Sequence, residues 1–354
     1  MDPVLILLCA IYLLLYAPYY VALSNIKKGA PRKAYQIFRR MFPVYSCMGR
    51  ANRGLAHHNL GVCLSQINER AEALQHFQIA IDNLAQSHRQ KHHDMAIMAT
   101  AASAFLHADI GNIEEGERLA EIAQAKLNPN ARFAPNVTVL VASTLFYAER
   151  FQEAEALLNK TLEFQKLDTI VKAVAYSYLA QSAYYQGHFT EAFEYSRKSD
   201  RCDVQLPYFN SGLLARLIVI AVELGDIAEA KQAEAKLVPM LQKLEEAHRN
   251  TAYVALSALS LARGDLDRTL DYAERGYNQH ATKRELANSL YLQASVYAQR
   301  KNYVRALQLI QEAETYPNFT LYRERLANLR HEVEAIGIVK RNVETNQPLN
   351  QIGR

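Results

Sequence analysis

Small side chains recur in pairs along the chain, and the two members of each pair are 12 residues apart. Two antiparallel helices pack closely only where the side chains at their crossing are small. Each pair therefore predicts one helical hairpin, with a small residue on each helix at a fixed distance from the turn. The pairs are Gly61 and Ala73, Ala104 and Gly116, Ala142 and Ala154, Ala180 and Ala192, and Ala294 and Ala306, with Ile218 and Ala230 and Ser257 and Thr269 as looser versions.

The hairpins repeat at a nearly constant period. The second members of successive pairs are 43, 38, 38, 38, 39 and 37 residues apart, which indicates seven units. The turn of most units holds a residue that tolerates a left-handed backbone at a helix end, namely Gly111, Gly187, Gly225 or Gly264, and Asn68 in the first unit. Because the apolar residues beside the small ones need a neighbouring hairpin to cover them, the pattern predicts an α-helical solenoid.

Two segments, 59–81 and 178–199, resemble the tetratricopeptide repeat. In the first segment the motif positions are occupied by Leu60, Gly61, Leu64, Ala73, Phe77 and Ala80. The resemblance covers about residues 50 to 316 and implies an all-α, right-handed solenoid of about seven to eight helical hairpins. The period near 38 exceeds the usual period of this family. We therefore expect helices that are longer by roughly one turn.

Residues 4–23 form an apolar run, VLILLCAIYLLLYAPYYVAL, without a charged residue. A helix of this length spans roughly 30 Å, the thickness of a bilayer core. Tyrosines near its C-terminal end, followed by basic residues, predict a single-pass transmembrane helix with the bulk of the chain in the cytoplasm. The alternatives are a cleaved secretory signal, although no positive charge precedes the run, and a buried helix of a soluble fold, although the run is long for one.

The repeat spacing extends into this apolar run. Ala22 and Ala34 are 12 residues apart and have Gly29 at the turn position, which predicts an eighth, degenerate unit over residues 15–41. Its first helix would be the end of the membrane segment itself. Pro31 occupies the position at which the other units have a hydrophobic side chain.

At the C-terminal end, residues 321–336 have the pattern of one amphipathic helix that ends at Gly337, which predicts a cap on the solenoid. The expected division of the chain is a transmembrane anchor at 1–24, a basic juxtamembrane segment and degenerate repeat at 25–50, the solenoid at 51–316, the capping helix at 317–337 and a disordered tail at 338–354.

Charge is distributed unevenly along the chain. The first 68 residues hold eight Lys and Arg and a single acidic residue, so they carry a net charge of +7, while the remainder is acidic and the whole chain has +4. An excess confined to one end does not indicate a nucleic-acid surface. It predicts either docking on an anionic membrane leaflet or only the control of topology. The residues assigned to the membrane surface are Lys27, Lys28, Arg32, Lys33, Arg39 and Arg40.

The sequence shows no motif of a catalytic class, such as a phosphate-binding glycine-rich loop, a Gly-x-Ser-x-Gly elbow or a His-Glu-x-x-His pair. We therefore expect neither an enzyme nor a cofactor. The best metal candidate is the pair His88 and His92, which are four residues apart and would share a face if both lay on one helix. The alternative is a solvated connection between repeats.

In the tetratricopeptide family the first helix of each hairpin lines a concave groove, and the resemblance implies such a binding surface here. Members that bind chaperone C-termini clamp a carboxylate with Lys, Arg and Asn side chains. In this chain only the Asn has a counterpart, which is Asn59. Aliphatic and tyrosine side chains favour an apolar helix or peptide as the partner. The alternative is that these residues pack against one another. The expected groove residues are Val139, Phe146, Tyr147, Gln181, Tyr185, Val219, Val254, Leu261 and Tyr291, preceded by His58, Val62 and Phe105.

These patterns predict a membrane-anchored scaffold or adaptor that recruits a protein partner on the cytoplasmic face. Lipid would contact the N-terminal segment, nucleic acid is not expected, and a homo-oligomer is compatible with the pattern. The alternatives are an exported or periplasmic repeat protein in envelope assembly or secretion, and a metal-binding protein built on His88 and His92.

Overall fold

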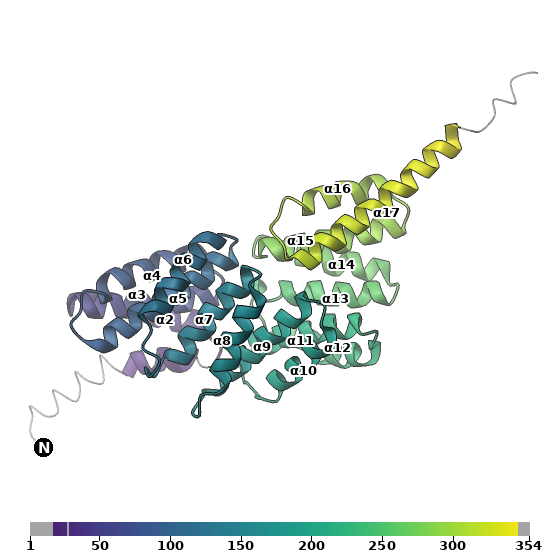
Figure 1. The fold of residues 1–354 in the computed structure, drawn as a ribbon. Coiled ribbons are helices and arrows are strands. Elements are labelled where there is room, and N and C mark those ends of the chain that lie inside the picture. The colour runs from purple at the N-terminus through teal and green to yellow at the C-terminus, as the bar shows by residue number, and fades with distance from the viewer. Residues whose placement is uncertain (1–16, 27, 346–354) are drawn as a thin grey trace, which may run out of the picture. The chain divides into compact units, whose positions relative to one another are not determined.

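The computed structural model describes residues 17–26 and 28–345. Within these residues all regular structure is helical, and the helices follow one another as hairpins (Figure 1). The first hairpin joins residues 17–26 to α2 (Pro31–Cys47). The next hairpins are α3 (Arg50–Gln66) with α4 (Arg70–Leu84), α5 (Gln90–Asp109) with α6 (Ile113–Lys126), α7 (Ala134–Tyr147) with α8 (Phe151–Leu162), α9 (Thr169–Tyr185) with α10 (Phe189–Asp200), α11 (Pro207–Glu223) with α12 (Ile227–Leu241), α13 (Asn250–Ala262) with α14 (Leu266–Gly276), and α15 (Lys283–Gln299) with α16 (Tyr303–Ala313). A short 3-10 turn, η1 (Glu246–His248), precedes α13, and α17 (Thr320–Thr345) follows the last hairpin.

Each of these eight hairpins has a residue with a left-handed backbone in its turn, always five positions before the second small residue of its pair. Five of the eight are glycine, which adopts this conformation without a steric penalty. The other three are not, and two of them, Glu149 and Lys301, have no sequence signal because residues with a Cβ rarely adopt positive φ. The eight residues are Gly29, Asn68, Gly111, Glu149, Gly187, Gly225, Gly264 and Lys301.

The small residues lie at the helix crossings, as their spacing predicts. Ala142 on α7 and Ala154 on α8 have no exposed surface. A Cβ atom on Gly116 would lie 3.0 Å from the carbonyl oxygen of Ala104, so the crossing of α5 and α6 has no room for a larger residue. The prediction of an all-α solenoid of helical hairpins is confirmed.

The first hairpin has the same construction. Ala22 and Ala34 have no exposed surface, and together with Phe38 they form a small core that also receives side chains from α3. Pro31 is the first residue of α2, where its missing N–H group needs no partner. Residues 17–26 and α2 are therefore packed as one hairpin onto the repeat that follows.

The transmembrane helix expected at residues 4–23 lies largely outside the described residues. Its C-terminal part, residues 17–23, is described and belongs to the first helix of the hairpin. In the part of the chain that the structure describes, no helix combines the length and the apolar character needed to cross a membrane.

The chain divides into two compact units. Unit 1 contains the described residues up to Ala183 and the segment Thr190–Leu213. Unit 2 contains Tyr184–Phe189 and the described chain from Leu214 onward. Helices α9 and α11 each contribute residues to both units, and each unit has its own hydrophobic clusters.

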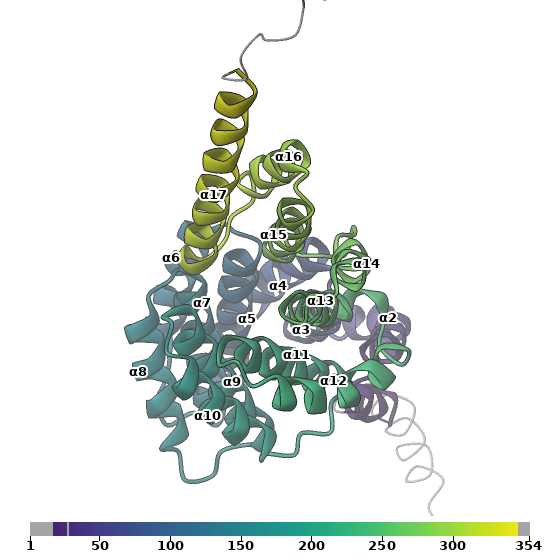
Figure 2. The ribbon, with the colours of Figure 1, turned by 90° about the vertical axis from the view of Figure 1, so that its right-hand side faces the viewer.

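Helix α17 is longer than the expected capping helix. It runs through Gly337 to Thr345, so the predicted end at Gly337 is wrong. A glycine in a helix interior weakens the helix by only about 1 kcal/mol relative to alanine, which does not by itself end it. The C-terminal half of α17 extends beyond α15 and α16 (Figure 2).

Candidate binding groove

Unit 1 contains a groove of about 700 Å³ that is lined by the first helices of its hairpins. Side chains line it from residues 17–26, α3, α5, α7 and α9, and therefore from five consecutive hairpins, and Phe77 of α4 adds a side chain from a second helix. We call this feature the apolar groove. Its main apolar residues are Leu23, Val62, Met98, Phe105, Val139 and Val174.

None of the described side chains that line the apolar groove is a Lys, Arg, Asp or Glu. Its few polar groups are amides, the hydroxyls of Tyr19 and Ser65, and the imidazole of His58. Burial lowers the pKa of His58 to about 4, so this ring is neutral at physiological pH. The groove is therefore an uncharged surface, in which an ionic group of a ligand would lose its hydration without gaining a counter-charge.

Two polar atoms at the groove have no hydrogen-bond partner among the described residues, namely Nδ1 of His58 and Oε1 of Gln66. His58 is only 5% exposed. A buried polar atom without a partner is unfavourable by about 1–3 kcal/mol. A ligand that offers a hydrogen-bond donor or a hydroxyl near these atoms would recover part of that free energy.

Some of the residues expected to line a groove in unit 1 do so, and others do not. Val139 lines the apolar groove. Phe146 is 1% exposed and packs in an aromatic cluster, with ring centroids 5.2 Å from Tyr147 and 5.5 Å from Tyr178. Gln181 is half-buried, and its Nε2 donates to the carbonyl oxygen of Ser177, one turn earlier in α9, at 3.3 Å. Phe146 is thus a core residue and not a groove residue.

Several groove residues were not among those expected from the sequence. Met95 and Met98 line the groove from α5, and Tyr19 and Ile26 line it from the first helix. A signal was present for α5, because residues 95, 98, 102 and 105 have the i, i+3, i+7, i+10 spacing of one helix face. The sequence pattern places Tyr19 in the predicted membrane anchor and Ile26 in the basic juxtamembrane segment that follows it.

In unit 2 the C-terminal ends of α9 and α11 and the helix α15 face the beginning of α17. The ring of Phe319, which directly precedes α17, stacks on Tyr185 with centroids 3.9 Å apart. The guanidinium of Arg284 lies 4.8 Å from the Phe319 ring centroid. Tyr291 of α15 meets Tyr322 of α17 edge to face at 6.2 Å. The expected groove residues Tyr185 and Tyr291 therefore pack against the chain's own C-terminal helix.

Arg325 of α17 provides the charged part of this packing. Its Nη2 lies 2.8 Å from Oε1 of Glu223 at the end of α11, and its Nη1 donates to the hydroxyl of Tyr184 at 3.4 Å. Burial opposes the positive charge of Arg325, but the tyrosine hydroxyls and Glu223 outweigh it and raise the pKa of Arg325. We call this set the α17 contact. It consists of Tyr184, Tyr185, Glu223, Phe319, Tyr322 and Arg325.

The three remaining expected groove residues of unit 2 are packing residues or are half-buried. Val254 is buried and packs with Ala273 and Leu292, and Leu261 packs against the same cluster. Val219 of α11 is half-buried. For Val254, mutual packing of repeats is the correct interpretation, because the α14 and α15 helices that follow cover it.

The histidine pair is not arranged as the sequence suggested. Helix α5 begins at Gln90, so His88 lies before the helix and cannot share a helical face with His92. The Nδ1 of His92 lies 2.5 Å from the hydroxyl of Ser87. Among the residues that the structure describes, no group of three or more His, Cys, Asp or Glu side chains is placed to hold a metal ion.

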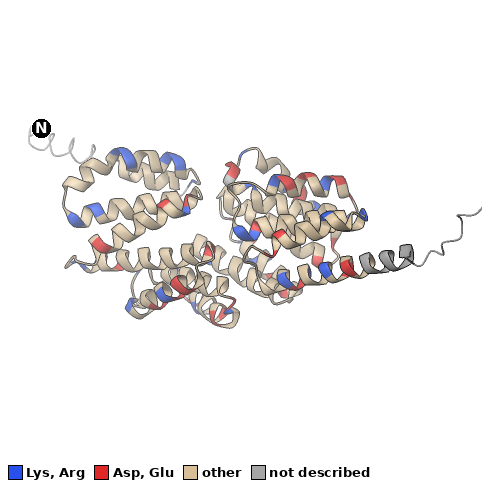
Figure 3. Cartoon of the chain, turned by 90° about the horizontal axis from the view of Figure 1, so that it is seen from above, with Lys and Arg blue, Asp and Glu red and all other residues tan. Residues whose placement is uncertain are grey.

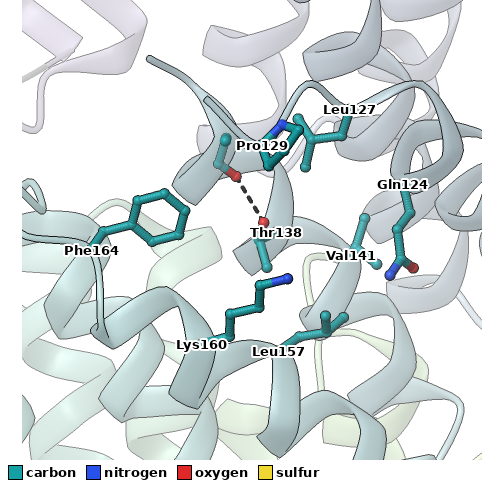
Figure 4. Close-up of a pocket in the computed structure, with 9 residues that line it drawn as sticks. Gln124, Leu127, Pro129, Thr138, Val141, Leu157, Lys160 and Phe164 are labelled. Carbon is teal, nitrogen blue, oxygen red and sulfur yellow. Dashed lines mark hydrogen bonds between the residues drawn. The ribbon is translucent and has the colours of Figure 1, made fainter. Parts of the chain in front are cut away.

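A smaller pocket of about 180 Å³ lies between α6, α7 and α8 of unit 1 (Figure 4). Thr138 donates to the carbonyl oxygen of Ala134 at 2.9 Å, which keeps its hydroxyl within α7. Lys160 is the single ionisable side chain among the residues that line this pocket. The pocket therefore lacks the paired acid and base that proton transfer would need.

No family model matches the sequence, and no curated protein matches it. Solved structures do match. A Rap protein complexed with competence and sporulation factor is 14% identical, with a TM-score of 0.68 over 93% of this chain and 89% of that chain. Cut9 in the Cut9–Hcn1 hetero-tetramer of the APC/C is 15% identical, with a TM-score of 0.63 over 88% of this chain and 55% of that chain.

These neighbours are helical repeat proteins of the tetratricopeptide type. At such low identity the likeness shows the fold alone. The chain is therefore an α-solenoid with tetratricopeptide-like hairpins.

Proposed function

We propose that this chain is a non-catalytic scaffold or adaptor that binds a protein partner in the apolar groove of unit 1. The observation that carries the proposal is the lining of that groove, which five hairpins supply without a charged side chain. The partner segment is an uncharged apolar helix or peptide, because a charged one would be desolvated without compensation. The structural likeness to a Rap protein that is complexed with a factor supports a ligand-binding role.

Three properties of the groove support this choice of partner. Its volume of about 700 Å³ lies within the range of sites that bury most of a ligand. Met95 and Met98 contribute unbranched, flexible side chains that can adapt to an irregular apolar surface. The unpaired Nδ1 of His58 adds one polar position that can orient the ligand.

The proposal is tested with two synthetic helical peptides of leucine, alanine and glutamine, one of which has a single inward-facing leucine replaced by lysine. We expect the uncharged peptide to bind in an anisotropy titration and the lysine peptide to bind at least about tenfold more weakly. Met98→Lys in the half-buried lining should weaken the uncharged peptide to a similar extent. Val238→Lys, at an exposed position of α12 in unit 2, is the matched control and should leave binding unchanged. Equal affinity for both peptides would refute the proposal.

For the cellular setting we propose attachment to a membrane through the apolar run that begins at residue 4 and continues into the first helix of the solenoid, with the solenoid in the cytoplasm. The support is the length of the apolar run and the basic residues that follow it. A reporter enzyme that works only in the cytoplasm, fused after Arg354, tests this orientation. Activity is expected. Silence of this reporter together with activity of a periplasmic reporter would favour the exported alternative.

A further inference from the structure

The outward face of α2 is basic. Four of its Lys and Arg side chains are exposed, and the spacing of residues 32, 33, 36, 39, 40, 43, 44 and 47 places all of the exposed residues on one side of the helix. The buried residues Ala34 and Phe38 lie on the opposite side. Helix α2 contains no acidic residue (Figure 3). The four basic residues are Arg32, Lys33, Arg39 and Arg40.

The same face continues into exposed apolar side chains toward the C-terminal end of α2. Val44 is 45% exposed and Met48 is 43% exposed. Tyr20, on the preceding helix, is 58% exposed and lines the same pocket as Met48. Large apolar side chains gathered next to cations are typical of a surface that something else covers.

Three of the four exposed basic residues of α2 keep their charge unpaired within the described part of the chain. Within the described part of the chain, Lys33, Arg39 and Arg40 form no ion pair. The acidic residue that shares a pocket with Arg39 is Glu72 of α4, and it accepts a hydrogen bond from the hydroxyl of Tyr35 at 3.4 Å. The positive charge of this face is therefore available to an external anionic surface.

We propose that this face of α2 docks on an anionic membrane leaflet. The basic residues bind the lipid phosphates, and Tyr20, Val44 and Met48 enter the interface between headgroups and acyl chains. A nucleic acid would bind the cations but would leave the apolar residues uncovered. The proposal deepens the proposed membrane attachment, since residues 4–23 end within the hairpin to which α2 belongs.

Cys47 offers a reporter on this face. It is exposed, whereas Cys63 is buried with its pKa raised to about 12 and is therefore poorly reactive. In the full chain with Cys9→Ser and Cys202→Ser, an environment-sensitive fluorophore can be attached at Cys47. This protein is reconstituted with vesicles of phosphatidylcholine alone or with part of it replaced by phosphatidylglycerol. We expect a blue shift that depends on phosphatidylglycerol and is reversed by high salt.

The double variant Arg39→Gln/Arg40→Gln should shift the ratio of docked to free α2 by about 25-fold, since each basic residue near an anionic surface contributes about fivefold. The matched control is Lys231→Gln/Lys236→Gln, which removes the same charge from two exposed positions of α12 in unit 2. The control should retain the blue shift. Circular dichroism of both variants should show unchanged helix content.

Three outcomes would overturn the proposal. They are the same fluorescence with and without phosphatidylglycerol, an equal loss of the shift in the α12 control, and a response to duplex DNA at the same salt that the vesicles do not produce. Failure of the membrane anchor is a separate result. In that case the chain does not float with phosphatidylcholine vesicles, but its binding to phosphatidylglycerol vesicles still reports on the α2 face.

Discussion

Units 1 and 2 are built from the same kind of hairpin, yet their first helices present different surfaces. In unit 1 they line an uncharged groove of about 700 Å³. In unit 2 residues of α9, α11 and α15 pack against Phe319, Tyr322 and Arg325, which are spaced three residues apart and therefore lie close together. The difference indicates that similar hairpins can form either a binding surface or a buried interface. Which of the two they form depends on whether other residues of the same chain cover them.

The largest effect is expected from a substitution at the start of α17 in unit 2. Phe319 is 3% exposed and lies between the ring of Tyr185 and the guanidinium of Arg284. Phe319→Ala should lower the free energy of unfolding by about 3–4 kcal/mol, because it removes a large buried side chain. Denaturant titration measures this loss, and hydrogen exchange should locate it in α15 and α17. Ile336→Ala, at an exposed position of α17, is the control. A loss below about 1 kcal/mol for Phe319→Ala would contradict the assignment.

The ion pair of the α17 contact should come next in size. Glu223→Ala leaves Arg325 partly buried without its carboxylate and should destabilise the protein by about 2–3 kcal/mol, somewhat below a fully buried pair because both side chains keep some exposure. Glu314→Ala removes one of the two carboxylates paired with Arg330, at the more exposed contact between the end of α16 and α17, and should have an effect below about 1 kcal/mol. Similar losses for the two variants would show that the Glu223 pair is no more buried than a surface pair.

A pH titration of stability tests the burial of His58 in the apolar groove of unit 1. Burial lowers the pKa of His58 to about 4, against 6.5 when it is exposed. The contribution of neutral His58 to the free energy of unfolding is fully present above pH 6.5. It is lost as the pH falls from 6.5 toward 4, because in this range the unfolded chain binds a proton that the folded chain does not. Between pH 8 and pH 5 the wild type should lose about 2 kcal/mol more than His58→Gln. Parallel pH profiles of the two proteins would disprove the burial of this ring in solution.

The smallest expected effect concerns the turns that the units share. Lys301 has φ of 61°, where glycine is favoured, so Lys301→Gly should raise the melting temperature, by a stability gain of about 0.5–1 kcal/mol. Gly225 is the matched turn of another hairpin, with φ of 73° and no atom within 4 Å of an added Cβ. Gly225→Ala should therefore lose a similar amount through the backbone alone. A loss of stability in Lys301→Gly would show that its side chain matters more than the backbone conformation.

The hairpins could be predicted from the sequence because their signal is local. Each hairpin needs a small residue at the helix crossing and a residue that tolerates positive φ in the turn. Both lie within one repeat of about 40 residues. The turns at Glu149 and Lys301 escaped detection because their conformation is imposed by the helices on either side. Met95 and Met98 were detectable from their spacing on α5, whereas the groove residues of 17–26 were hidden within a run that also has the pattern of a membrane helix.

The α17 contact could not be predicted by the same means. Tyr184 and Tyr322 are 138 positions apart, and no periodic pattern relates residues at that distance. Tyr185 and Tyr291 have the position and chemistry of groove residues, and only the placement of α17 shows that they are covered. The amphipathic pattern of residues 321–336 predicts a capping helix, but it does not indicate that Arg325 pairs with Glu223 of α11.

The central claim is that the apolar groove of unit 1 is the binding site and that α17 covers the corresponding surface of unit 2. Hydrogen exchange of the full chain, with and without the uncharged helical peptide, tests it most directly. We predict slower exchange in α3, α5 and α7 on saturation with peptide and unchanged exchange in α15 and α17. Protection confined to α15 and α17, or no protection in α5, would contradict it.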